Sequence, residues 1–375
     1  MKIFLFDMDG VLLESHGYHL ALQETVCRMA RALGFGDVTL STEDIATFES
    51  GGISSEWDEA AISAALLLKT VWEVDPERRL PDSLAGNVTS VNPQPGPDFN
   101  VLAQVLSGPE QLSRHPLERA EHYFISTNHF TQAQSDTLLE LLHGAHDPQR
   151  ALTHRTFQEL VLGSAEFTLT YGLPARLGCE SYLLKYDISN LSSEESACLR
   201  DWIYATSHAA AVITSRPSRP PAGIFSTPEA ELGAALVGLE GLPIAGWGGI
   251  TWLGQQRRTD PKSFVKPSPV HALAALRMSL GEGQETALSH AADLVETRKA
   301  GTDWQRLDGA QVCIFEDTPG GIKSLQAAQE TLNKAGIQIK TKYFGIAQKP
   351  VKMQALRANT AQVFPSLVEA LSLAI

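Results

Sequence analysis

The sequence contains little cysteine. Four cysteines occur among the 375 residues, at positions 27, 179, 198 and 313, and they form neither a Cys-x-x-Cys pair nor a cluster with histidine. This spacing excludes a disulfide framework and a cysteine-based zinc site, because both need numerous or closely spaced cysteines. We therefore expect reduced thiols and a cytoplasmic protein.

Long apolar runs are also missing. The first run is apolar for only four residues, Ile3 to Phe6, before Asp7 interrupts it, and no small-residue cleavage site follows. Elsewhere no run approaches the roughly 18 apolar residues that a membrane-spanning helix needs. We expect a chain without a signal peptide and without a membrane partner.

Positive charge is scarce relative to negative charge. The chain has 30 lysines and arginines against 43 acidic residues, a formal net charge of −13. Nucleic acids and anionic membranes bind basic surfaces, so this balance argues against either partner. An anionic small molecule would need a local group of cations, backbone amides or a metal ion.

What the chain does have is enough apolar material for two cores. Hydrophobic residues make up 43% of the sequence, and the length exceeds that of one ordinary domain. From about residue 192, short apolar strands alternate with helices, and Ile3–Phe6 fits the same pattern. This alternation predicts an α/β fold with a doubly wound, Rossmann-like parallel sheet. The further predicted strands are Ala210–Thr214, Pro243–Trp247, Val312–Phe315 and Lys342–Ile346.

Residues 16–195 interrupt this pattern between the first strand and the rest of the sheet. Helical periodicity dominates the segment, most clearly over residues 18–33 and 56–74, and predicts a large, mainly helical inserted cap domain. Residues 81–98 are rich in proline and glycine and lack apolar periodicity, which indicates a flexible loop within that domain. The sheet domain is then assigned to residues 1–15 and 196–375.

Reactive side chains follow several predicted strands at their carboxyl ends. In an open α/β sheet these ends meet at one edge, where ligands bind. A lysine at the start of a predicted helix, in Lys266-Pro267-Ser268-Pro269, joins them. The strand-end residues are Asp7, Asp9, Thr214, Glu316 and Asp317.

This ordered set resembles the haloacid dehalogenase superfamily, in particular its phosphatase branch with a helical cap inserted after the first motif. The resemblance covers roughly residues 1–15 and 200–375. The four matching motifs are Asp7-Met8-Asp9-Gly10-Val11, Ala211-Val212-Ile213-Thr214, Lys266-Pro267-Ser268-Pro269 and Glu316-Asp317-Thr318-Pro319-Gly320-Gly321.

The resemblance implies a role for each carboxylate of the first motif. Asp7 is expected to be the nucleophile, because a carboxylate can attack phosphorus and form an aspartyl-phosphate that water then opens. Asp9 is expected to protonate the leaving group and then to activate the water. Lys266 would balance the negative charge of Asp7 and the phosphate.

The other motif residues are expected to bind phosphate and metal. Thr214, the amide of Ser215 and the exposed backbone at Gly10 would contact phosphate oxygens. Asp7 and Asp317 would hold Mg²⁺, a hard cation that prefers oxygen ligands. The resemblance adds the backbone carbonyl of Asp9 as a ligand, and Glu316 as an outer or alternative one.

The inserted domain carries weaker candidates. Glu56, Trp57 and Asp58 follow a glycine turn at the place where capped members of the family carry a substrate-specificity loop. An equally good interpretation is that Ser55 caps a helix and that Trp57 packs in a core. Four cations are possible contacts to a second anionic group or ordinary surface residues: Arg155, Arg176, Lys185 and Arg216.

The leading functional prediction is a Mg²⁺-dependent phosphatase for a small phosphorylated metabolite, of the sugar-phosphate or phosphoglycolate type, acting as a monomer or homodimer. The large insertion argues against phosphoprotein substrates, which need an open site. A β-phosphoglucomutase-like phosphomutase shares all four motifs and stays as the alternative. An inactive phosphate-binding scaffold is disfavoured because the nucleophile, the acid and the lysine are all present.

Overall fold

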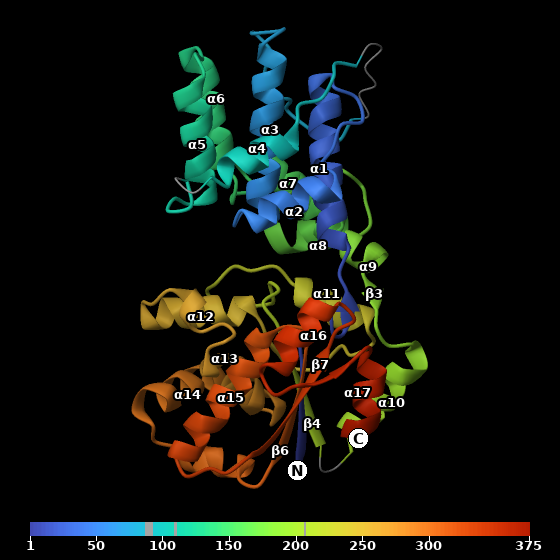
Figure 1. The fold of residues 1–375 in the computed structure, drawn as a ribbon, viewed down its shortest axis with the longest axis vertical. Helices are drawn as coiled ribbons and strands as arrows, with labels where there is room; N and C mark the ends of the chain where they lie inside the picture. The colour runs from blue at the N-terminus through green and yellow to red at the C-terminus, as the bar shows by residue number, and fades with distance from the viewer. Residues whose placement is uncertain (87–92, 109–110, 206–207) are drawn as a thin grey trace. The chain divides into compact units, whose positions relative to one another are not determined.

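The chain divides into two compact units. The computed structural model describes residues 1–86, 93–108, 111–205 and 208–375. We call Met1–Ser15 with Asp187–Ile375 the sheet unit, and His16–Tyr186 the helical unit. The fold of each can be followed in Figure 1.

The second junction falls earlier than the sequence predicted, at Asp187 instead of residue 196. The reason is a small ribbon in which β3 (Ile188–Ser189) pairs antiparallel with β2 (Leu13–Glu14). Asn190 extends it, because its backbone N–H donates to the carbonyl of Leu12 at 2.9 Å. These residues therefore belong with the first strand's loop and not with the insertion.

A parallel sheet forms the centre of the sheet unit, which confirms the predicted Rossmann-like α/β fold. Within the described residues it has six strands, in the order β5-β4-β1-β6-β7-β8, and every neighbouring pair is parallel. In that order the strands are Ile244–Ala245, His208–Ile213, Lys2–Phe6, Gln311–Glu316, Lys340–Ile346 and Gln362–Phe364.

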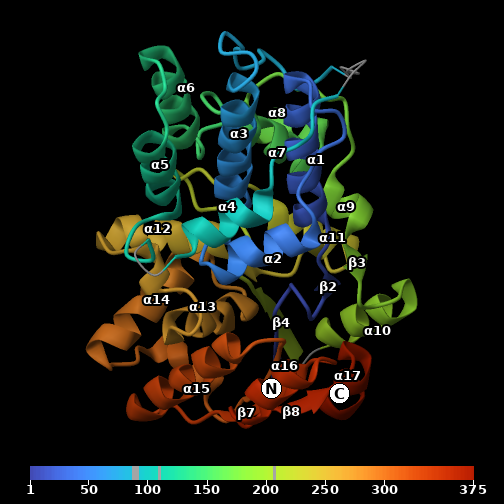
Figure 2. The same ribbon diagram turned by 45° about the horizontal axis from the view of Figure 1, so that its top comes forward.

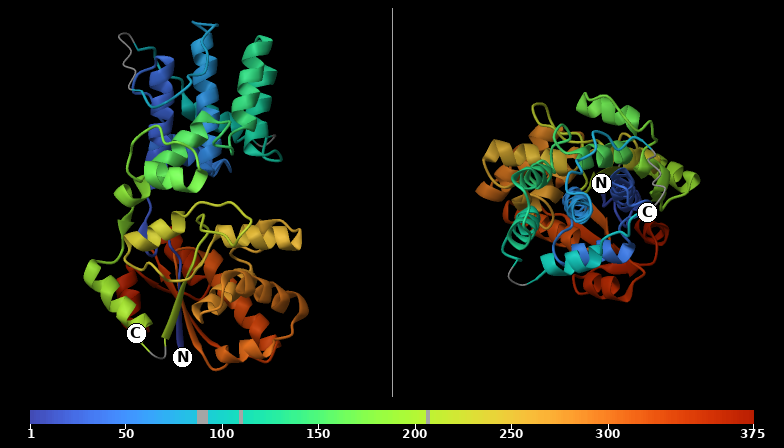
Figure 3. Two further views of the ribbon diagram at one scale, coloured as in Figure 1. Left: turned by 180° about the vertical axis from the view of Figure 1, so that it is seen from behind. Right: turned by 90° about the horizontal axis from the view of Figure 1, so that it is seen from above.

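The sheet is buried on both faces, and its alternating side chains separate into two apolar layers. Ile3 and Leu5 of β1 pack into one layer, and Phe4 and Phe6 into the other. Figure 3 shows helices on either side of the strands. Helices of the first layer are α12 (Trp247–Arg257), α13 (Pro269–Ser279), α14 (Gln284–Thr297), α15 (Pro319–Lys334) and α16 (Pro350–Arg357). Those of the second are α10 (Ser193–Ile203), α11 (Glu229–Leu236) and α17 (Leu367–Ala374).

One predicted strand is shorter than expected. Pro243–Trp247 was predicted as a strand, but β5 has only two residues and Trp247 begins α12. The start of α12 carries no helix signal in the sequence, because the glycines at positions 248 and 249 disfavour helix interiors. In the structure they lie inside a helix at close approaches, since a Cβ at Gly249 would lie 2.7 Å from the Gln284 side chain.

The helical unit is built around α3 (Glu56–Trp72), which is buried along most of its length and contacts α1, α5, α6 and α7. Figure 2 shows these helices from a second direction. Its other helices are α1 (Gly17–Leu33), α2 (Thr42–Ser50), α4 (Phe99–Leu106), α5 (Pro116–Thr127), α6 (Gln132–His143), α7 (Leu152–Leu162), α8 (Ser164–Tyr171) and α9 (Tyr182–Tyr186).

The proline- and glycine-rich loop is described only in part. Residues 81–86 and 93–98 contain no helix or strand, as predicted, and residues 87–92 lie outside the described residues. All four cysteines are free. No helix in the described part of the chain is long and apolar enough to cross a membrane.

Candidate active site

The predicted strand-end residues meet at one edge of the sheet. β1 lies between β4 and β6, and Phe6 is in register with Val212 on one side and Phe315 on the other. The rings of Phe6 and Phe315 stack with centroids 4.9 Å apart beneath this edge. The residues that follow these strands are therefore held on a rigid, apolar base.

Three carboxylates converge there. Asp7, Glu316 and Asp317 each offer an oxygen, and these atoms all lie within 4.8 Å of one another. The three side chains are 8%, 0% and 11% exposed, so water screens their mutual repulsion poorly. Burial, followed by the charge of Glu316, raises the pKa of Asp7 well above its ordinary value, although Lys266 opposes this. The cluster carries more negative charge than its buried lysine neutralises, and such an oxygen-rich group suits a hard divalent cation.

Lys266 joins two members of this cluster. Its Nζ lies 2.8 Å from Asp7 Oδ1 and 2.7 Å from Glu316 Oε1. Burial alone would lower the pKa of Lys266, but the charges of Asp7 and Glu316 outweigh it and raise the pKa. Lys266 is therefore held as a cation against the predicted nucleophile.

A buried histidine fixes the backbone of this lysine. The N–H of Lys266 donates to His271 Nδ1 at 3.2 Å, and His271 Nε2 lies 2.9 Å from the carbonyl of Ala245. Burial and the nearby Lys266 charge lower the pKa of His271 to about 3, so the ring is neutral with its proton on Nε2. The start of α13 is thereby tied to the end of β5.

Glu316 is occupied by neighbours on both oxygens. Oε1 accepts from Lys266, and Oε2 accepts from the N–H and hydroxyl of Thr318 at 3.2 and 3.0 Å. This leaves Asp7 and Asp317 as the better candidates for a metal, with Glu316 orienting Lys266. The sequence had left Glu316 open between an outer and a direct ligand.

Asp9 is hydrogen-bonded to Arg216, which the sequence left open between a contact to a second anionic group and a surface cation. Arg216 donates from Nε to Asp9 Oδ1 at 2.8 Å and from Nη2 to the same oxygen at 2.6 Å. Arg216 also pairs with Asp187 at 2.9 Å and has a side chain only 2% exposed. The interpretation of Arg216 as a surface cation is therefore wrong, because it is buried between two carboxylates.

This pairing sets the protonation state of Asp9. Crowding by protein would raise its pKa, but the charge and hydrogen bonds of Arg216, together with a bond from Ser15, outweigh that effect and lower it. The Asp9 side chain is still 43% exposed. In this arrangement Asp9 is an ionised carboxylate that can accept a proton, and donating one requires prior protonation against Arg216.

The second motif contributes a buried hydroxyl. Thr214 is fully buried, and its Oγ1 accepts the N–H of Arg216 at 3.1 Å. Ser215, between them, is exposed. The tight turn after β4 therefore places Thr214 under the edge of the sheet and Arg216 beside Asp9.

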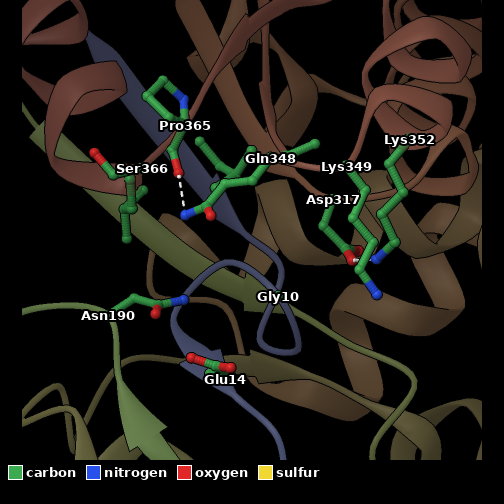
Figure 4. A pocket seen from close by; sticks show the side chains of 12 residues that line it. Gly10, Glu14, Asn190, Asp317, Gln348, Lys349, Lys352, Pro365 and Ser366 are labelled. Atoms are coloured by element: carbon green, nitrogen blue, oxygen red, sulfur yellow. Dashed lines mark hydrogen bonds and ion pairs between the residues drawn. The ribbon is translucent and has the colours of Figure 1, made fainter.

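A cavity of about 370 Å³ opens beside Asp317. Figure 4 shows Lys352 directed at the Asp317 carboxylate and Lys349 next to it, both from the start of α16. The sequence did not single out these lysines, although they follow the carboxyl end of β7. The cavity is lined by Gly10, Glu14, Asn190, Asp317, Ile346, Ala347, Gln348, Lys349, Lys352, Pro365, Ser366 and Leu367.

The candidates in the insertion have structural partners inside the helical unit. Ser55 caps α3 by accepting the N–H of Asp58 at 3.5 Å. Asp58 is 2% exposed and pairs with His146 at 2.6 Å, and Trp57 stacks on His154 with centroids 4.9 Å apart. These contacts favour the capping and packing interpretation, and a substrate role for Glu56, Trp57 or Asp58 stays a prediction.

Comparisons with known proteins bear on the fold alone. Neither protein-family models nor curated proteins give a significant match to this sequence. The X-ray structure of Northeast Structural Genomics Consortium target ZR25 is similar over 99% of this chain and 98% of that one, with a TM-score of 0.58 and 16% sequence identity. This chain therefore shares its α/β fold with a solved structure.

Proposed function

We propose that the sheet unit is a Mg²⁺-dependent phosphatase that hydrolyses a small phosphate monoester through an aspartyl-phosphate on Asp7. One observation carries the proposal: Lys266 binds Asp7 and Glu316 at once, beside Asp317, at the edge where ligands of parallel sheets bind. Phosphate monoesters hydrolyse extremely slowly in water, so both a positioned nucleophile and charge stabilisation are needed.

The geometry of Asp7 suits nucleophilic attack. Oδ1 accepts the N–H of Met8 at 2.8 Å and also binds Lys266. No described residue hydrogen-bonds Oδ2, which is thus the oxygen left to attack phosphorus. A bond from Oδ2 to phosphorus would form as the ester P–O bond breaks, and the leaving oxygen would take a proton from the protonated form of Asp9 or from water.

Asp9 is suited to the second half of the reaction. In its ionised form it can remove a proton from the water that attacks the aspartyl-phosphate, which regenerates the Asp7 carboxylate and releases phosphate. The first half is easier for leaving groups that need no proton, such as p-nitrophenolate. Bound Mg²⁺, held by Asp7, Asp317 and by resemblance the Asp9 carbonyl, would neutralise charge on the phosphoryl oxygens.

Metal removal is a direct prediction. Phosphate release should fall to background in EDTA and return when excess Mg²⁺ is added, because the carboxylate cluster otherwise repels an anionic substrate. The measurement is phosphate release from sugar phosphates, phosphoglycolate, nucleotides and p-nitrophenyl phosphate, with a phosphopeptide as the substrate expected to fail. Full activity in EDTA would contradict the metal assignment.

The same panel separates the alternatives. Isomerisation of a hexose 1-phosphate without phosphate release would identify the phosphomutase. Inactivity in both assays with Mg²⁺ present, combined with phosphate binding, would identify a scaffold. A phosphatase that prefers the phosphopeptide would overturn the small-molecule assignment.

Gly10 offers a second prediction. Its φ of +74° favours glycine, and a Cβ there would lie 2.6 Å from the Asp317 carboxyl carbon. Gly10→Ala should displace Asp317 and lower kcat/KM by about 100-fold, because small misplacements at a reacting centre are costly. Gly309 also has φ +74° but open space around it, so Gly309→Ala is the matched control. Both variants share the strain of an alanine at positive φ, and Gly10→Ala should lose further stability by displacing Asp317. Equal activity in the two folded variants would contradict the proposed role of Asp317.

A further inference from the structure

The helical unit contains a cavity of about 300 Å³. It lies between the end of α6, the segment before α7 and the chain around residues 80–82. Three arginines line it: Arg150, Arg155 and Arg176. The cavity shares no lining residue with the one beside Asp317.

Carboxylates neutralise the charges of these arginines only in part. Arg155 donates from Nη2 to the carbonyl of Pro174 at 2.7 Å, and Arg176 donates from Nη1 to the carbonyl of Asp82 at 3.0 Å. Neither forms an ion pair with a carboxylate among the described residues, and Arg155 Nε is buried without a partner there. Burial and the neighbouring Arg176 charge lower the pKa of Arg155, and the charge of Glu159, which does not line the cavity, only partly opposes them.

Two carboxylates, on Asp82 and Glu140, also line the cavity, one fewer than the arginines. The Asp82 side chain makes no ion pair with Arg176, which uses the Asp82 backbone carbonyl instead. Guanidinium N–H donors therefore remain available to a ligand. Arginine forks fit oxyanions in a bidentate manner.

The first turn of α7 adds backbone donors to the same wall. α7 runs from Leu152 to Leu162, and its N-cap residue, Ala151, provides no side-chain cap. Ala151 and Leu152 both line the cavity. The positive end of the helix, with amides that lack a side-chain acceptor, favours an anion at this position.

We propose that this cavity binds the phosphate group of a small phosphorylated molecule through Arg150, Arg155, Arg176 and the first turn of α7. Besides the charged residues, Gln149 and Ala151, five leucine and proline side chains line it, so an uncharged organic body fits beside the phosphate. The site lies wholly within the helical unit and does not depend on the chemistry proposed for Asp7. Experiments can therefore contradict phosphate binding in this cavity without contradicting hydrolysis at Asp7, and the reverse.

The test is calorimetric titration of the full chain with pyrophosphate, without Mg²⁺. The Arg155→Met/Arg176→Met double variant should bind at least about tenfold more weakly, since each lost charged hydrogen bond contributes substantially. Arg114→Met is the matched control, because Arg114 lies in the same unit, does not line the cavity, and donates from Nη1 to the uncharged Gln111 side chain at 3.0 Å. Its affinity should stay within about twofold of wild type.

Three results would overturn the proposal: no binding by wild type, equal affinity in the double variant, or citrate binding as tight as pyrophosphate. The last would mark a general polyanion site. If circular dichroism shows that the double variant is unfolded, Arg150→Met tests the site instead. Arg150 is exposed, so its replacement should leave the fold intact. That single variant should weaken pyrophosphate binding about threefold or more, and an unchanged affinity would overturn the site.

Discussion

Replacing Asp7 by asparagine is expected to abolish phosphate release, with kcat lower by about 10⁴-fold or more, because the amide lacks the carboxylate that forms the covalent intermediate. Asparagine keeps the shape of the side chain, but it lacks both the attacking oxygen and the negative charge that faces Lys266. The measurement is phosphate release with the best substrate of the panel at saturating Mg²⁺. Asp201→Asn, a change of the same type on the exposed face of α10, should keep full activity.

In the absence of Mg²⁺, the same variant should be at least as stable as wild type near neutral pH. The folded-state pKa of Asp7 is raised, so the folded chain holds a proton that the unfolded chain releases. The free energy of unfolding therefore falls as the pH rises above the ordinary pKa of aspartate, and a neutral side chain avoids this loss. If the Asp7→Asn protein is inactive only because it is unfolded, its inactivity does not support Asp7 as the nucleophile. Retention of activity within tenfold of wild type would exclude that role.

Replacing Glu59 by methionine is expected to stabilise the helical unit strongly. Glu59 lies on α3 with 1% of its surface exposed, and its Oε2 has no hydrogen-bond partner among the described residues. Burial, with smaller contributions from Glu56, Glu49 and Asp58, raises its pKa from 4.5 to about 9. Keeping this carboxyl in the fold is therefore costly whenever the unfolded chain would ionise it.

The pH dependence follows from these values. Between about pH 4.5 and 9 the folded chain binds a proton that the unfolded chain lacks. The wild-type free energy of unfolding should fall with rising pH through this window, by about 1.4 kcal/mol per pH unit at most. Glu59→Met should gain about 2–3 kcal/mol at pH 7 and almost nothing near pH 4.5.

Urea unfolding at pH 5 and pH 8 measures this difference. Glu77→Met is the control, because Glu77 is an exposed carboxylate of the same unit, and its effect should stay within about 0.5 kcal/mol at both pH values. Parallel pH profiles for wild type and Glu59→Met would show that Glu59 ionises normally in the folded chain. A destabilised Glu59→Met would show that its carboxyl has a partner that the fold requires.

Much of the sheet unit could be predicted because its signals are local. Ile3–Phe6 is a continuous apolar run ended by Asp7, and this pattern specifies a buried parallel strand with its reactive loop at the carboxyl end. The proline at position 269 marks the start of α13, and Ser366 marks that of α17, since both residue types favour helix starts. The start of α12 could not be predicted, because Gly248 and Gly249 disfavour a helix locally and their packing involves residues distant in sequence, such as Gln284.

The features of the candidate active site also divide into those that could be predicted and those that could not. Sequence by itself determined which side chains stand at the strand ends, because parallel strands put their carboxyl ends on one edge whatever the rest of the chain does. Only the tertiary structure decided their partners. Arg216 is buried against Asp9 and Asp187, Lys352 pairs with Asp317, and Arg155 and Arg176 share a cavity. These pairings join residues far apart in the chain, and charge, burial and pKa depend on such neighbours and not on the order of residues.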